Sequence, residues 1–267
     1  MLEQIILGAI QGVTEWIPVS SKGCVIAAKI NFFNSNGSLN ELINYALLLH
    51  LGTFFAALAY FWKDICNIVA SITKPQDTSN DGHKILIFLV TTTVLTALGQ
   101  VLINNVSALT QSAPQAKLAI TLLIASLLIV AGFLQLKTSA AGLRTPKDLT
   151  VMDGIILGLV QAAATLPGLS RAGTTMAALS MRRFDKENML KLSFLMSMPV
   201  ILVGNLVRNY KTFLHAGIEW VGVIVAFVVG ILTISTLMNF ARRVNFGAFL
   251  IFIGAILAVA AMFGFID

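Results

Sequence analysis

The chain has 267 residues, of which 57% are hydrophobic and only 11% are charged, and its mean hydropathy is +0.86. Soluble domains carry about 25% charged residues, so this composition excludes an ordinary soluble globule as well as a disordered chain. The formal net charge of +6 indicates membrane topology in so apolar a chain, and we expect no nucleic-acid partner. The sequence therefore predicts a single integral membrane domain over residues 1–267, multi-pass and located in the plasma membrane.

Membrane-spanning segments are the first elements to be expected. A helix needs about 20 mostly apolar residues to cross roughly 30 Å of hydrocarbon. Six segments qualify, at 42–62, 85–104, 117–136, 189–207, 218–240 and 246–266. Two shorter apolar stretches, 4–13 and 151–164, each run into a proline and restart after a polar cluster. Because proline interrupts a helix, each of these stretches predicts a re-entrant helical hairpin that does not cross the membrane.

The two broken segments also resemble each other. Residues 6–23 read ILGAIQGVTEWIPVSSKG and residues 156–173 read ILGLVQAAATLPGLSRAG. With one residue deleted, the matched pairs are Gln11 with Gln161, Pro18 with Pro167, Ser21 with Ser170 and Lys22 with Arg171. Each hairpin precedes three expected spans, so the halves at about 1–140 and 141–267 predict an inverted-topology repeat. Chance similarity between segments rich in Ala, Leu and Gly is the alternative.

Charge placement predicts the orientation of this all-α polytopic membrane protein. Lysine and arginine gather in the loops around 63–84, 137–150, 182–188 and 241–245. The 105–116 loop has neither, and the 208–217 loop has only Arg208 and Lys211. By the positive-inside rule, the basic loops are cytoplasmic, so both termini and the opening of the active site are expected on the extracytoplasmic side. The two hairpins then enter from opposite faces, and their polar tips meet near the middle of the membrane.

The second tip has the chemistry of a phosphate site. A helix that starts near Ser170 would direct free N–H groups and its positive dipole end into the cavity. Arg171 adds a planar fork of donors suited to phosphate, and Thr174 and Thr175 add hydroxyl groups. A buried Glu15–Arg171 pair that only holds the hairpins together, with the serines as helix caps, is the alternative.

The first tip carries an acid instead. Gln11 and Glu15 are four residues apart and share one helix face. Glu15 could act as a general acid or base, or could bind, with Gln11, a divalent cation (Mg²⁺ or Ca²⁺) that bridges phosphate oxygens. Ser20 and Ser21 are expected to contact phosphate, and Ser21 is also a candidate nucleophile.

Two other residue types are interpreted as structural. His50 lies within the first expected span at a depth from which it could reach the tips, but a packing role is the commoner one for a buried histidine. Trp16, Trp62 and Trp220 lie near expected span ends, which is typical of aromatic residues at the membrane interface.

At both tips the sequence resembles the undecaprenyl-diphosphate phosphatase family, also called the bacitracin-resistance phosphatases. Residues 11–21, QGVTEWIPVSS, match its (E/Q)xxxE motif and the segment that follows, and residues 167–175, PGLSRAGTT, match its PGxSRxxxT motif. The resemblance covers the whole chain. It implies an inverted-repeat fold with two re-entrant hairpins and removal of the terminal phosphate of a polyprenyl diphosphate. That reaction recycles the lipid carrier of envelope glycan synthesis.

The resemblance also implies roles for individual residues. Glu15 takes an acid–base or metal-linked role supported by Gln11, and Ser21 takes a catalytic or phosphate-binding one. Arg171 becomes the diphosphate clamp, beside Ser170 and Thr175. The chain departs from the family at Cys24, where a histidine is common, and at Ala172, where a serine is common. Cys24 is expected to line the substrate site, but a thiol is a poor substitute for imidazole as a proton carrier, which favours a mechanism centred on Glu15 and Arg171.

Two rival functions use the same cavity. A transporter or flippase of polyprenyl phosphate would need the phosphate cradle but not hydrolysis, and inverted repeats with broken helices are typical of transporters. A scaffold that has lost activity is the third alternative. Phosphate release and lipid translocation in proteoliposomes discriminate between the phosphatase and the transporter. Homodimer formation is also expected.

Overall fold

The computed structural model describes residues 1–33, 35, 37–73, 81–109, 143–165, 170–215, 217, 219–243 and 246–262, and single positions between 122 and 136. Its helices are α1 (Leu2–Thr14), α2 (Ser21–Phe33), α3 (Leu39–Tyr60), α4 (Trp62–Thr73), α5 (Asp81–Leu109), η1 (Pro146–Asp148), α7 (Val151–Ala163), α8 (Arg171–Met181), α9 (Lys186–His215), α10 (Glu219–Arg243) and α11 (Phe246–Met262). Within these ranges the only extended pairing is an isolated bridge between Arg144 and Phe184. The prediction of an all-α protein is confirmed.

Four of the described helices, α3, α5, α9 and α10, are long and apolar enough to cross a membrane. They match the spans predicted at 42–62, 85–104, 189–207 and 218–240, so the protein is a multi-pass membrane protein. Helix α11 matches the span predicted at 246–266 and has 17 residues. The span predicted at 117–136 lies mostly outside the described residues.

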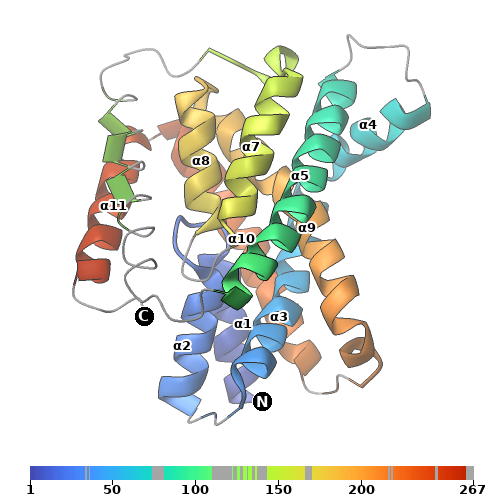
Figure 1. Ribbon diagram of the computed structural model, residues 1–267, viewed down its shortest axis with the longest axis vertical. Helices are drawn as coiled ribbons and strands as arrows, with labels where there is room; N and C mark the ends of the chain where they lie inside the picture. The colour runs from blue at the N-terminus through green and yellow to red at the C-terminus, as the bar shows by residue number, and fades with distance from the viewer. Residues whose placement is uncertain are drawn as a thin grey trace.

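The two pairs of short helices form hairpins. Helices α1, α2 and α7 have 13 residues each and α8 has 11, so none is longer than about 20 Å at roughly 1.5 Å per residue, too short to cross a bilayer. In Figure 1, α1 and α2 occupy the lower part of the molecule and α7 and α8 the upper part. The ends of the hairpins approach each other near the centre of the helix bundle (Figure 1), where Arg171 of α8 is paired with Glu15 after α1.

Each hairpin packs its first helix on a span from the other predicted half of the chain. Helix α1 lies along α10, where a Cβ atom at Gly8 would collide with the carbonyl oxygen of Gly222. Helix α7 lies along α5, where a Cβ atom at Gly158 would be 2.8 Å from Cβ of Leu95. These close approaches require glycine because any side chain would push the helices apart. The position of each tip therefore depends on both parts of the chain.

We expect Gly8→Ala to lower the melting temperature of the detergent-solubilised protein, because the new methyl group overpacks the α1–α10 contact at a cost of about 1–3 kcal/mol. Differential scanning fluorimetry measures the shift. Gly204→Ala is the matched control, since a Cβ atom at Gly204 in α9 would meet nothing within 4 Å. Equal melting temperatures for the two variants would contradict the assigned helix contact.

A buried acid fixes the end of the second hairpin that is farthest from its tip. Asp153 is fully buried, and its carboxylate accepts hydrogen bonds from Arg144 Nη2 at 2.6 Å and from Arg182 Nε at 2.7 Å. The same residue completes the capping box at the start of α7 with Thr150. One carboxylate thus ties the segment before α7 and the end of α8 to the first turn of α7.

Trp16 anchors the turn that follows α1. Its side chain is 1% exposed and packs edge-on against Phe194 of α9, with ring centroids 4.8 Å apart. The interpretation of Trp16 as an interface residue is therefore wrong. The chain reverses direction after Trp16 inside the protein, so the indole enters the hydrophobic core and fixes the backbone that carries Glu15.

Candidate active site where the two hairpins meet

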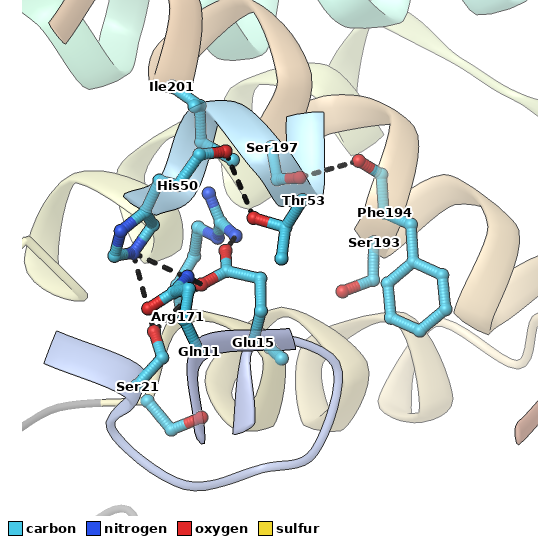
Figure 2. Close-up of polar contacts among 12 residues, drawn as sticks. Gln11, Glu15, Ser21, His50, Thr53, Arg171, Ser193, Phe194, Ser197 and Ile201 are labelled. Carbon is cyan, nitrogen blue, oxygen red and sulfur yellow. Dashed lines mark hydrogen bonds and ion pairs between the residues drawn. The ribbon is translucent and has the colours of Figure 1, made fainter. Parts of the chain in front are cut away.

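Glu15 is the centre of the site. It follows the last residue of α1, and its side chain is 2% exposed. One carboxylate oxygen, Oε1, is paired with Arg171 Nη2. The other, Oε2, accepts hydrogen bonds from Gln11 Nε2 at 2.8 Å and from Ser21 Oγ at 2.7 Å (Figure 2). The structure therefore brings together Gln11, Glu15, Ser21 and Arg171, as the sequence predicts.

Ser21 is placed by the start of α2. It is the first residue of that helix, and Ser20 before it caps the helix end by accepting a hydrogen bond from the Gly23 N–H at 3.3 Å. Lys22, the next residue, is half-buried. The free N–H groups of this helix start and the Lys22 ammonium favour an anion in front of Ser21.

Arg171 is placed in the same way by the start of α8. It is the first residue of that helix, and Ser170 before it accepts a hydrogen bond from the Gly173 N–H at 3.1 Å. Its guanidinium is paired with Glu15, but the side chain is 19% exposed and is therefore not fully buried. Both α2 and α8 therefore begin after a capping serine and have a basic residue in the first turn, although the cap of α2 is Ser20 and not Ser21, which aligns with Ser170 in the sequence.

His50 is the site residue that sequence analysis undervalued. It projects from the middle of α3, is 4% exposed, and its Nε2 atom lies 3.1 Å from Glu15 Oε2 and 3.3 Å from Ser21 Oγ. Figure 2 shows the imidazole directed at these two side chains. The available signal was an ionisable residue inside a predicted span, which favours a functional role by default.

The remaining predicted substrate-binding residues lie around this group. The Thr174 hydroxyl donates to the backbone carbonyl oxygens of Ser170 and Arg171 at the start of α8. Thr175 is fully buried, and its hydroxyl is 2.7 Å from Ser193 Oγ of α9, so it joins α8 to α9. Cys24 lies in the first turn of α2 and is half-buried. Their roles in substrate binding stay predictions.

The donors around Glu15 do not form a ready cation site. A carboxylate offers about four lone-pair positions, and Arg171, Gln11, Ser21 and His50 approach it from the protein side. No cluster of three or more His, Cys, Asp or Glu side chains that could hold a metal ion occurs in the described part of the chain. Gln11 Oε1 is buried and has no hydrogen-bond partner, which leaves one oxygen free. The residues as arranged therefore do not fit a resident Mg²⁺ or Ca²⁺.

Comparison with known proteins places this chain among relatives of similar length. The family model described as bacitracin resistance protein BacA matches residues 4–261. Proteins named undecaprenyl-diphosphatase from Methanococcoides burtonii and Moorella thermoacetica are each 34% identical, over 98% of this chain and 98% and 96% of their own. A third protein of that name, from Haloarcula marismortui, is 35% identical over 93% of this chain and 92% of its own. The chain belongs to the BacA family.

Proposed function

We propose that this protein is a membrane phosphatase that removes the terminal phosphate of undecaprenyl diphosphate, giving undecaprenyl phosphate and inorganic phosphate and so recycling a lipid carrier. The relatives' name, undecaprenyl-diphosphatase, supports this substrate. The observation that carries the proposal is the buried Glu15 carboxylate in contact with both a serine hydroxyl and an arginine guanidinium. Neither the name of these relatives nor the family favours the transporter alternative.

The two helix starts suit a diphosphate. The N–H groups at the start of α8 and the Arg171 fork would bind one phosphoryl group. The start of α2, with Lys22, would bind the second. Binding requires Arg171 to exchange its contact with Glu15 for contacts with phosphate oxygens, which leaves the carboxylate free to accept a proton.

The geometry favours Ser21 as the nucleophile. Its hydroxyl already donates to Glu15 Oε2 at 2.7 Å, so the proton passes to the carboxylate as Oγ forms a bond to the terminal phosphorus. The bond from that phosphorus to the bridging oxygen breaks, and lipid monophosphate leaves. The oxygen of a water molecule then forms a bond to the phosphoserine phosphorus, and the bond from phosphorus to Oγ breaks. Glu15 returns its proton to the Ser21 oxygen, and one proton of the water passes to solvent as inorganic phosphate leaves. Arg171 stabilises the charge on the phosphoryl oxygens throughout.

Phosphate release from undecaprenyl diphosphate by the purified protein in nanodiscs tests the proposed function. We expect release of one phosphate per lipid and accumulation of the monophosphate. Farnesyl diphosphate and longer homologues serve as a chain-length series. No release at any chain length, with Mg²⁺ and Ca²⁺ each supplied, would refute the proposal. Movement of intact lipid phosphate across proteoliposomes would favour the transporter instead.

We also propose that both termini and the opening of the site face the extracytoplasmic side. The concentration of basic residues in the loops around 63–84, 137–150, 182–188 and 241–245 supports this orientation. Enzyme reporters that are active on only one side of the membrane, fused at either terminus, test it. Activity of both fusions on the cytoplasmic side would reverse the orientation.

Two further predictions concern partners of the protein. Binding of Mg²⁺ or Ca²⁺ by Glu15 and Gln11 would require the donors around Glu15 to rearrange. It stays a prediction, and phosphate release measured with and without a chelator tests it. The homodimer also stays a prediction, and light scattering in detergent, which gives the molar mass of the protein, tests it.

A further inference from the structure

The orientation of the His50 imidazole is set by its own helix. Its Nδ1 atom is 2.6 Å from the carbonyl oxygen of Ala46, one turn earlier in α3. A carbonyl oxygen only accepts hydrogen bonds, so Nδ1 carries a proton and donates it. The second nitrogen, Nε2, is therefore the atom that faces Glu15 and Ser21.

The three facing atoms form a closed triangle. Ser21 Oγ lies 2.7 Å from Glu15 Oε2, His50 Nε2 lies 3.1 Å from the same oxygen, and Nε2 lies 3.3 Å from Oγ. The contact between imidazole and carboxylate is favourable only when one proton lies between them. That proton fixes the carboxylate, while the Ser21 hydroxyl donates to the same oxygen.

Buried polar side chains with a packing role have other surroundings. The buried amide of Asn209 in α9, for example, donates to Asn205 Oδ1 and to the Asn44 carbonyl oxygen, and so joins helices. The Nε2 atom of His50 instead lies against Glu15 and Ser21, the two side chains that exchange a proton in the proposed function. His50 belongs to α3, which is part of neither hairpin (Figure 2).

We propose that His50 is a positioning residue of the phosphatase reaction. The hydrogen bond to the Ala46 carbonyl oxygen fixes the orientation of the imidazole. The imidazole in turn holds the Glu15 carboxylate in line with the Ser21 hydroxyl while Arg171 moves to the phosphate. The proposal rests on the proposed function. It adds a residue from α3 to a site otherwise built from α1, α2 and α8.

Two substitutions at His50 test this role. We expect His50→Ala to lower kcat for undecaprenyl diphosphate by about 10- to 100-fold with KM little changed, because outer partners that orient a reacting group have effects of this size. His50→Gln should recover most of the lost kcat, since a glutamine amide can donate from nearly the position of Nε2. His83→Ala, in the first turn of α5, is the control and should retain wild-type kcat.

The outcomes separate the two proposals. A wild-type protein that releases no phosphate refutes the proposed function and, with it, the role of His50. Active wild type with unchanged kcat in His50→Ala refutes the role of His50 alone. A His50→Gln variant as slow as His50→Ala refutes positioning through a hydrogen bond.

A second measurement covers the case in which His50→Ala does not fold. The chain has three histidines, so protein labelled with ¹⁵N-histidine gives few imidazole signals, and that of His50 is assigned with His50→Gln. We expect the Nε2 signal of His50 to shift in Ser21→Ala and in Glu15→Gln. An unchanged Nε2 signal in both variants would overturn the proposal.

Discussion

Replacement of Arg171 by alanine is expected to lower kcat/KM for undecaprenyl diphosphate by about 10³-fold, the scale seen when a charged donor to a transferring phosphoryl group is removed. Arg171 is the cation in direct contact with Glu15, and it stands at the start of α8, where backbone N–H groups also face an anion. Arg171→Lys should recover only part of the loss, because an ammonium group cannot reproduce the two parallel donors of guanidinium. Steady-state phosphate release measures both variants.

Arg183→Ala is the matched control for Arg171. Arg183 is an exposed arginine just beyond the other end of α8, so its loss removes one positive charge without altering the site. If Arg171→Ala retained wild-type kcat/KM, the phosphate clamp would have to be placed elsewhere. If both arginine variants lost activity equally, the effect would come from net charge and not from the fork.

Glu15→Gln is expected to reduce kcat by about 10²- to 10⁴-fold, the range for removal of a general acid or base, while substrate binding is retained or becomes tighter. The amide keeps the size of the side chain but cannot accept the Ser21 proton. It also removes the negative charge that holds Arg171, so phosphate no longer competes with a carboxylate for the guanidinium. Single-turnover phosphate release and equilibrium binding of the lipid diphosphate measure the two effects separately.

The same variant distinguishes a catalytic pair from a structural one. If the Glu15–Arg171 contact only held the hairpins together, Glu15→Gln would lower the melting temperature and weaken binding and turnover in parallel. Glu3→Gln is the control for that outcome, because Glu3 forms a 2.5 Å ion pair with Lys29 that joins α1 to α2 away from the tips. Full turnover in Glu15→Gln would contradict the acid–base role.

Much of the fold follows from local sequence. The lengths of the apolar segments predicted the spans that became α3, α5, α9 and α10, and Pro18 marked the break between α1 and α2. Glu15 and Arg171 were recognisable because ionisable side chains are costly at membrane depth. The cost of burying an ionisable side chain does not reveal which buried groups are in contact. The contact of His50 with Glu15 depends on how α3 packs against α1 and α2.

The matched glutamines of the two hairpins show a second limit. Gln11 and Gln161 align in the sequence, but only Gln11 reaches Glu15. Gln161 Nε2 donates to Thr96 Oγ1 at 3.1 Å and to the Met196 carbonyl oxygen at 3.3 Å, beside Pro199 within α9. Gln11 therefore contacts the acid of the candidate site, whereas Gln161 joins α7 to α5 and α9.

The packing of α1 on α10 also constrains the order in which the protein can mature. Helix α1 leaves the ribosome before α10, so it finds its place only after the segment Glu219–Arg243 has been synthesised and inserted. Until then, Gly8 and Gly12 of α1 have no α10 to pack against. A chain that ended after α9 would contain Glu15, Ser21, His50 and Arg171, yet it would have no α10 to seat α1. We therefore expect catalytic competence only after α10 has been synthesised and inserted.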